Sequence, residues 1–223
     1  MKLDKVLAIA IDGPVGVGKS TIAKLLARKL GIMYVDTGAM YRTVAYYCIQ
    51  NNIDITSSAQ VENCLDSINI QLTHKNSTQK IFLNGKDVTD AIRTQSIADT
   101  TSIIAANPAV RDKLVQLQRK IAEGTSIVMD GRDIGSQVLP GAQVKIYLDA
   151  SPEVRARRRM LQLKSKGQPA HFPTILKETK MRDTRDTTRD ISPLVKTPDA
   201  FYINSSNISQ KEVVAMIMEL VKE

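Results

Sequence analysis

Tryptophan is absent from this 223-residue sequence, and aromatic residues make up only 4% of it. Proteins that hold single-stranded nucleic acid stack bases on exposed aromatic rings, so the composition gives no indication of that function. No apolar run approaches the roughly 20 residues that a membrane-spanning helix needs. The N-terminal segment has a charge and a short apolar run, but no cleavage site follows it. We therefore expect a cytoplasmic protein with no membrane partner.

Cysteine and histidine are also scarce, with two residues of each. Cys48 and Cys64 have no metal-ligand spacing, so we expect them to be buried or free thiols of a reduced protein. His74 and His171 fall in polar, turn-like stretches and are expected at the surface. These residues argue against a zinc site, a disulfide framework and catalysis by histidine.

Positive charge is concentrated in one segment. The net charge is +8, and residues 153–190 hold eleven Lys or Arg residues against five Asp or Glu residues. This segment therefore carries six of the eight net charges. A localised cationic segment indicates a mobile clamp for phosphates, and nucleic-acid binding is the competing interpretation.

The stretch from residue 6 to residue 28 organises the rest of the chain. Residues 6–11 form a short apolar run rich in β-branched residues, which is typical of a strand buried on both faces of a parallel sheet. The next residues match G-x-x-x-x-G-K-[ST] at every fixed position and are Gly13, Pro14, Val15, Gly16, Val17, Gly18, Lys19 and Ser20, with Thr21 after them. Apolar residues then recur at helical spacing up to Gly31, where a helix would end.

This motif predicts a phosphate-binding loop, or P-loop. Glycine lets successive backbone N–H groups point at one phosphate, and the following helix N-terminus adds positive potential. Lys19 would reach the β- and γ-phosphates, and the Ser20 hydroxyl would ligate Mg²⁺. An ordinary glycine-containing turn is the alternative, but the flanking strand and helix favour a site for a nucleoside triphosphate.

A second strand–helix junction follows at residues 33–50. Residues 33–35 read as a strand that neighbours the P-loop strand, and Ala39 to Gln50 read as a helix. Tyr41 and Arg42 would then lie at the end of the sheet where α/β proteins bind ligands. Taken singly, Tyr41 is better explained by packing and Arg42 by a solvated charge.

The middle of the chain changes pattern. Between residues 63 and 92 apolar and polar residues alternate, with turns expected at residues 74–78 and at Asn84-Gly85, so we expect local antiparallel strands. Residues 94–123 read as two helices broken near Asn107-Pro108. A buried strand then ends at Asp130, which is well placed to act on Mg²⁺ directly or through water.

The C-terminal part continues the α/β alternation. Strands are expected at residues 144–148 and 201–203, and helices at 152–166, 173–190 and 209–221. Arginines recur along the first two of these helices, with aspartates beside those of the second, so ion pairs along a solvated face are an alternative to phosphate binding. Arginine in place of lysine favours bidentate phosphate contacts. No linker is long enough to divide the chain into domains.

Seven ordered motifs together resemble the bacterial type of cytidylate kinase, within the nucleoside-monophosphate kinases of the P-loop class. They are IDGPVGVGKST, DTGAMYR, IRTQ with AANPAVR, DGRDIG, VKIYLDAS, RRRMLQLKSKG and RDTRDTTR, the last followed by Pro193-Leu194. The resemblance covers nearly the whole chain. It implies a single α/β domain over residues 1–223, with a central parallel sheet flanked by helices, a small β-containing monophosphate-binding insert at about 63–92 and a helical lid at about 153–170.

The resemblance further implies transfer of the γ-phosphoryl group of ATP to CMP or dCMP, with Mg²⁺, by a monomer that binds no nucleic acid. Around the acceptor it implies Thr37, Tyr41, Arg42, Ser102, Arg111, Arg132, Asp133, Arg182, Asp186 and Arg189. Around the donor it implies the P-loop residues and the lid arginines at 155, 157, 158 and 159, with Arg157 on ATP. Catalytic roles are implied for Lys19, Arg132, Arg158 and Arg182, and metal ligation for Ser20 and Asp130. Some family members carry glycine at the position of Ser20.

Physical chemistry agrees with this hypothesis. Phosphoryl transfer needs two anions held in line and their charge neutralised, which arginines from several segments supply. The acceptor phosphate is already largely ionised at neutral pH, so no general base is required. The alternatives are a P-loop kinase for UMP, AMP or shikimate, and a nucleotide-regulated RNA-binding module that uses the basic segment 153–190.

Overall fold

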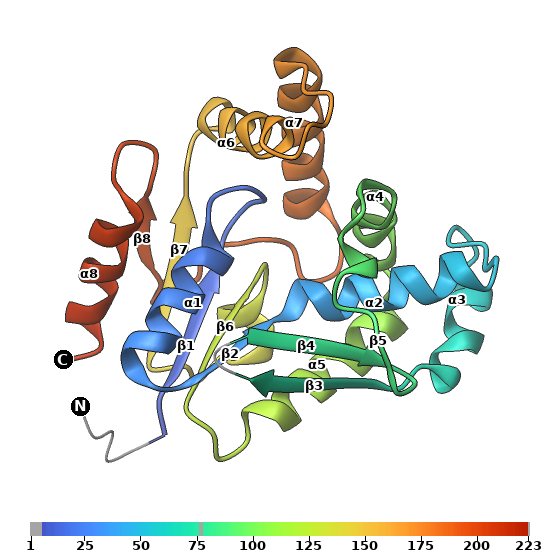
Figure 1. Cartoon of the computed structure of the whole chain (residues 1–223). Helices are drawn as coiled ribbons and strands as arrows, with labels where there is room; N and C mark the ends of the chain where they lie inside the picture. The colour runs from blue at the N-terminus through green and yellow to red at the C-terminus, as the bar shows by residue number, and fades with distance from the viewer. Residues whose placement is uncertain (1–5, 76–77, 223) are drawn as a thin grey trace.

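A parallel five-stranded sheet forms the centre of the molecule (Figure 1). The computed structural model describes residues 6–75 and 78–222. The strand order in the sheet is β2–β6–β1–β7–β8. These strands span Ala8–Asp12 (β1), Met33–Asp36 (β2), Ile127–Gly131 (β6), Val144–Asp149 (β7) and Phe201–Asn204 (β8). The predicted α/β fold with a central parallel sheet is confirmed.

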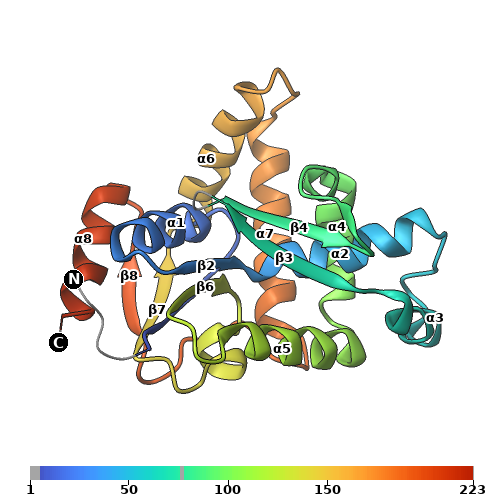
Figure 2. The same ribbon diagram turned by 60° about the horizontal axis from the view of Figure 1, so that its bottom comes forward.

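Helices cover both faces of this sheet, as the apolar pattern of β1 requires. Ile9 and Ile11 pack in one core cluster with α1 (Lys19–Leu30) and α8 (Gln210–Leu220). Ala10 faces the other side, in a cluster that α5 (Pro108–Ala122) covers. Figure 2 shows α1 and α8 on one face and α5 on the other. Because β1 is buried on both faces, it reads as a continuous apolar run.

Strand β2 lies at the edge of the sheet, so the prediction that it neighbours the P-loop strand was wrong. Strand β6 pairs with β1 on one side and β2 on the other. The exposed edge of β2 is covered instead by the small sheet: the Asp36 N–H donates to Gln79 Oε1 at 2.8 Å, and His74 Nε2 lies 2.6 Å from Tyr34 O. These contacts pair backbone groups that an edge strand leaves free.

Local antiparallel structure follows, as predicted. Strands β3 (Ile70–Lys75), β4 (Thr78–Leu83) and β5 (Lys86–Asp87) form a three-stranded sheet. The turn at Asn84-Gly85 is confirmed, and both residues have positive φ (49° and 82°). The turn expected at 74–78 includes residues 76 and 77, which lie outside the described residues.

The small sheet packs on a layer of helices. These are α2 (Thr37–Gln50), α3 (Ser58–Cys64) and α4 (Gln95–Ile104), with short helical turns at Leu65–Ser67 and Ala91–Arg93. The break between α4 and α5 falls at Asn107, whose side chain caps α5 ahead of Pro108. Cys48 and Cys64 are buried free thiols in this cluster, as predicted.

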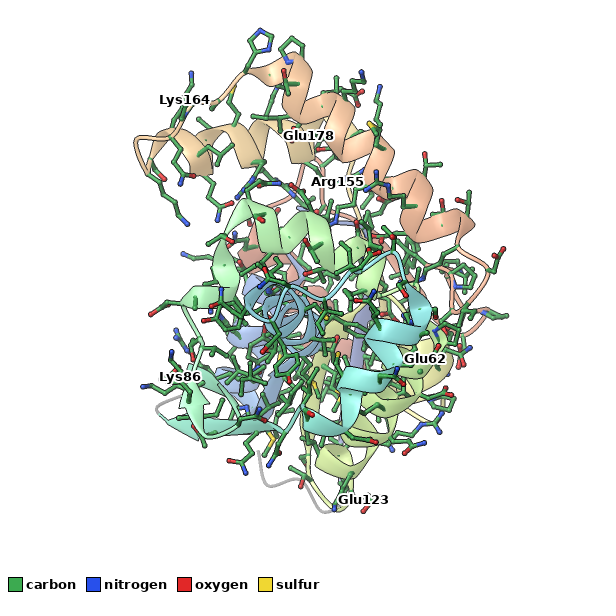
Figure 3. All side chains as sticks on the ribbon, turned by 90° about the vertical axis from the view of Figure 1, so that its right-hand side faces the viewer. Glu62, Lys86, Glu123, Arg155, Lys164 and Glu178 are labelled. Atoms are coloured by element: carbon green, nitrogen blue, oxygen red, sulfur yellow. The ribbon has the colours of Figure 1, made fainter. Side chains whose placement is uncertain are left out.

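Two packed helices, α6 (Pro152–Lys164) and α7 (Phe172–Thr188), stand above the carboxyl ends of the strands (Figures 1 and 2). Ion pairs join them: Arg155 binds Asp183 at 2.6 Å, and Lys180 lies 3.2 Å from Glu153. Arg155 lies where the helix pair meets the rest of the molecule, and Lys164 lies at the outer end of α6 (Figure 3). Within the described residues, none of the helices combines the length and apolarity needed to cross a membrane.

Candidate active site

A cavity of about 410 Å³ opens at the carboxyl end of the central sheet. The P-loop, the N-terminus of α2, the chain after β6, and helices α4 and α7 line it. Parallel strands place their carboxyl ends at one edge, which is where ligands bind in α/β sheets. The cavity therefore brings together the P-loop and one of the two arginine-bearing helices that the sequence singled out, α7.

The P-loop depends on its glycines. Gly13, Gly16 and Gly18 have φ values of 148°, 77° and 104°, a region that side chains disfavour. A Cβ on Gly13 would lie 1.9 Å from the Leu148 carbonyl oxygen on the neighbouring strand. Helix α1 begins at Lys19, directly after the loop, so its N-terminal N–H groups would face a phosphate bound in the loop.

Lys19 is buried at the base of this loop. Its ammonium donates to Gly13 O at 2.7 Å and to Pro14 O at 2.8 Å. Burial, and then the nearby Arg132, lower the pKa of Lys19 to about 7. A bound polyphosphate would supply the negative charge that favours the ammonium form.

A hydroxyl and a carboxylate lie side by side next to Lys19. Ser20 Oγ donates to Asp130 Oδ2 at 2.8 Å, and the Tyr34 hydroxyl donates to Asp130 Oδ1 at 2.9 Å. Burial, and then the charge of Asp36, raise the pKa of Asp130 to about 6. Mg²⁺ in kinases takes one or two protein oxygens, with phosphates and waters as its other ligands. This donor set fits Mg²⁺, and the hydrogen bond from Tyr34 orients the carboxylate.

The other end of the cavity is lined by arginines, several of which pair with aspartates. Arg42 Nη2 donates to Asp36 Oδ2 at 2.7 Å, and Arg132 Nε donates to Asp186 Oδ2 at 2.7 Å. Burial, the largest single effect, raises the pKa of Asp186, but the charge and hydrogen bond of Arg132, together with Arg182 and Arg189, hold that pKa below its ordinary value. These carboxylates orient the guanidinium groups without using all of their donors.

A third pair, Arg111 with Asp133, is the most deeply buried of these. Arg111 Nη2 donates to Asp133, and Arg111 Nη1 donates to Ala105 O at 3.1 Å. The Arg111 guanidinium carbon lies 5.6 Å from the centre of the Tyr41 ring, so the ring also fixes its position. Arg111 and Asp133 are 3% and 5% exposed, and the pair therefore presents a donor and an acceptor in a desolvated setting.

Unpaired polar atoms gather in this cavity. Among the described residues, seven buried side-chain nitrogen or oxygen atoms have no hydrogen-bond partner, and five belong to residues that line it. These five are Tyr41 Oη, Arg42 Nε, Arg111 Nε, Arg182 Nε and Arg189 Nη2. Leaving a buried donor unpaired costs about 1–3 kcal/mol. Anionic oxygens would satisfy most of these donors at once.

The residues predicted around the acceptor lie together in the structure. All ten residues expected around the acceptor line the cavity. They come from β2–α2, α4, α5, the chain after β6, and α7, segments that are far apart in the sequence. The roles of the individual residues stay predictions.

The predicted donor site is assembled only in part. Six P-loop positions line the cavity, namely Val15, Gly16, Gly18, Lys19, Ser20 and Thr21, whereas Gly13, Pro14 and Val17 do not. Arg157 is exposed on α6. Arg158 Nη2 donates to Ser205 O at 2.6 Å, and its Nη1 to Val17 O at 3.2 Å. The structure thus places neither arginine among the cavity residues, and their roles stay predictions.

Seven cavity residues were missed by the sequence prediction, and two of them, Asp36 and Gln162, carry polar side chains that are informative here. Asp36 pairs with Arg42 and caps α2 by accepting the Ala39 N–H at 2.9 Å. An aspartate directly before a helical pattern is a capping signal, so Asp36 was detectable as a cap but not as a partner of Arg42. Gln162 enters from α6, and no local pattern marks it.

A P-loop and an arginine-lined anion site, facing each other across one cavity of an α/β fold, define the class of P-loop kinases. The model of the family "Cytidylate kinase" matches residues 9–223. Two relatives named cytidylate kinase are similar over almost their full lengths. The one from Bacillus cytotoxicus is 45% identical over 99% of this chain and 98% of its own. The one from Fervidobacterium nodosum is 49% identical over 96% of each chain. The chain belongs to the cytidylate kinase family, which confirms the predicted resemblance.

The fold has also been seen in a more distant chain. The crystal structure of an uncharacterized protein from Eubacterium ventriosum superposes with a TM-score of 0.53 at 15% identity, covering 97% of this chain and 99% of that one. At this identity the likeness concerns the fold alone.

Proposed function

We propose that this protein transfers the γ-phosphoryl group of ATP to CMP or dCMP, giving ADP and the nucleoside diphosphate. Family membership supports this reaction. The observation that carries it is the cluster of unpaired buried guanidinium donors opposite the P-loop. A single triphosphate on the P-loop leaves these donors unused, whereas a second phosphorylated ligand would satisfy them.

The P-loop would hold the donor. Its N–H groups and the α1 N-terminus would bind the β- and γ-phosphates, with Lys19 at the γ-phosphate. Ser20 and Asp130 would hold Mg²⁺, which neutralises charge on the donor phosphates when bound. Lys19, about half protonated near neutral pH in the free protein, would become fully protonated against the triphosphate.

The arginine end would hold the acceptor. Arg42, Arg132 and Arg182 line the cavity, and their guanidinium groups would bind the acceptor phosphate. An oxygen of that phosphate would form the new bond to the γ-phosphorus while the bond to the β–γ bridging oxygen breaks, which releases ADP. No proton has to be removed from the attacking oxygen, because the monophosphate is ionised.

The buried pair of Arg111 and Asp133 supports a cytosine base. A carboxylate accepts from the amino group of cytosine, and a guanidinium donates to the neighbouring ring acceptors. Uracil has a carbonyl in place of that amino group, so two hydrogen-bond acceptors, the carbonyl and the Asp133 carboxylate, would face each other. Ser102, which also lines the cavity, supplies a hydroxyl at the same end.

The test is a coupled assay of ADP release from MgATP with CMP, dCMP, UMP, AMP and shikimate as acceptors. The proposal expects the highest kcat/KM with CMP or dCMP. Preference for AMP or shikimate would refute the assignment. Tight binding of RNA that weakens steeply with salt would point instead to the nucleic-acid alternative.

A further inference from the structure

Asp12 joins the donor side of the cavity to the acceptor side, although it does not line the cavity itself. It is the last residue of β1 and directly precedes Gly13 of the P-loop. Its carboxylate is 6% exposed. Oδ1 accepts the backbone N–H of Ile134 at 2.8 Å, and Oδ2 accepts that of Gly135 at 2.7 Å.

These two N–H groups open a short helical turn, Ile134–Val138, that begins directly after Arg132 and Asp133. Asp12 lies opposite Gly131 in the β1–β6 register, so the chain leaving β6 must turn across the end of β1. The Asp12 carboxylate holds that turn. One residue therefore touches the P-loop through its backbone and the acceptor loop, residues 131–135, through its side chain.

The acceptor loop is shaped for this contact. A Cβ on Gly135 would lie 3.4 Å from Asp12 Oδ2 and 3.3 Å from Lys145 Cδ. A Cβ on Gly131 would lie 2.6 Å from Ile134 Cδ1. Glycine at both positions lets the backbone come close enough for the carboxylate to bind two successive N–H groups.

The surroundings of Asp12 do not favour its charge. Burial, the largest effect, raises its pKa to about 6, even though the two N–H groups lower it. The charged groups around it are Asp133, which raises this pKa, and Lys19, which lowers it, with Arg132 and Lys145 close by. Ionised Asp12 therefore lowers the stability of the free protein at neutral pH. Destabilising charged groups of this kind are typical of functional sites.

We propose that Asp12 is a positioning residue for phosphoryl transfer, which rests on the proposed function. By fixing the acceptor loop to the end of β1, it sets the distance between the P-loop and Arg132. Arg132 in turn binds Asp186 on α7. Through this ion pair, the position of the acceptor loop also affects the position of α7, which carries Arg182.

The test is Asp12→Asn, which keeps the shape but turns an N–H₂ group toward one of the two N–H donors. We expect kcat to fall about a hundredfold, because displacing an aligned group by about 1 Å costs that much. The KM for the acceptor should rise, whereas the affinity for MgADP stays within about threefold. The proposal would be overturned by a wild-type kcat in the variant. It would also be overturned if the variant lost MgADP affinity by the same factor as it lost acceptor affinity.

Two further variants complete the design. Gly135→Ala should move the loop slightly and lower kcat about three- to tenfold, with the same split between kcat and MgADP affinity. If Asp12→Asn fails to fold, the proposal is tested by Gly135→Ala alone, through a lowered kcat at unchanged MgADP affinity. Asp54→Asn is the matched control, because the Asp54 carboxylate also accepts two hydrogen bonds, from Thr56, in an exposed loop outside the cavity. It should keep wild-type kcat.

A measurement independent of turnover separates this proposal from the proposed function. Amide hydrogen exchange of the peptide 131–138 should be faster in Asp12→Asn than in the wild type, with the exchange of α8 unchanged. Equal exchange in both proteins would overturn the positioning role, whatever acceptor the enzyme uses. A wild type with a different preferred acceptor would refute only the assignment to CMP and dCMP, and kcat would then be compared on that acceptor.

Discussion

Replacing Arg182 by methionine should stabilise the free protein and weaken acceptor binding at the same time. Arg182 lies on α7 and lines the cavity, and its buried Nε has no hydrogen-bond partner among the described residues. Burial, and then the repulsion from Arg132, lower its pKa from 12.5 to about 10. Asp186 offsets this only in part.

The magnitude follows from that pKa. A lowered pKa disfavours the cation at every pH below about 10, so the cost applies in full at pH 7.5. Each pKa unit is worth about 1.4 kcal/mol, which gives about 3 kcal/mol; solvent screening of this partly exposed side chain reduces it to about 2 kcal/mol. Methionine keeps the packing of the side-chain stem. The melting temperature of the free protein should therefore rise by about 4–8 °C.

Acceptor use should change in the opposite direction. A hydrogen bond to a charged group contributes about 1.5–3 kcal/mol, so the KM for CMP should rise about ten- to a hundredfold, while the KM for ATP stays within about threefold. Calorimetric melting and steady-state kinetics measure the two effects. Arg28→Met is the matched control, since Arg28 is an exposed arginine at the end of α1, away from the cavity. A lower melting temperature combined with an unchanged KM for CMP would refute the reasoning.

Two other perturbations address the P-loop. Lys19→Met should lower kcat about a thousandfold through loss of a positioned cation, and a loss of only a few-fold would contradict its role. Because the pKa of free Lys19 is about 7, binding of MgATP at pH 7.5 should take up about 0.8 proton per site. Calorimetry in two buffers of different ionisation enthalpy measures this proton uptake. Binding of MgATP to the native protein without proton uptake would count against the mechanism. Gly13→Ala would place its Cβ 1.9 Å from Leu148 O and should lower the melting temperature by about 10 °C or more, whereas Gly141→Ala, which meets open space, should lower it by about 2 °C at most.

Local sequence patterns predicted most of the elements, because buried strands, caps and glycine turns leave signals within a few residues. The β1–P-loop–α1 unit and the Asn84-Gly85 turn are examples. Strand order leaves no such signal: β2 and β6 are both short apolar runs, and nothing in either shows that β6 takes the place beside β1. The edge position of β2 becomes visible only when Gln79 and His74 are seen covering it.

In the candidate site, too, the features with a local sequence signal were predicted, and those that depend on distant contacts were not. Motifs predicted residues that the structure places in one cavity, but the ion pairs among them join distant positions, such as Arg132 with Asp186, and helical spacing does not reveal such partners. The arginines of α6 were all expected over ATP. Arg155 binds Asp183 and the P-loop carbonyl of Val15, so it forms an ion pair as the alternative expected, but in a buried setting and not on a solvated face.

The central claim is that one cavity holds a triphosphate on the P-loop and a cytosine monophosphate on the facing arginines. Its most direct test is the rate of ADP release from MgATP with CMP, dCMP, UMP or AMP as the acceptor, each at subsaturating concentration. The account predicts a kcat/KM for CMP or dCMP at least about a hundredfold above that for AMP, equivalent to about 2.7 kcal/mol of transition-state binding. ADP release that is fastest with AMP, or no faster with CMP than without an acceptor, would contradict it.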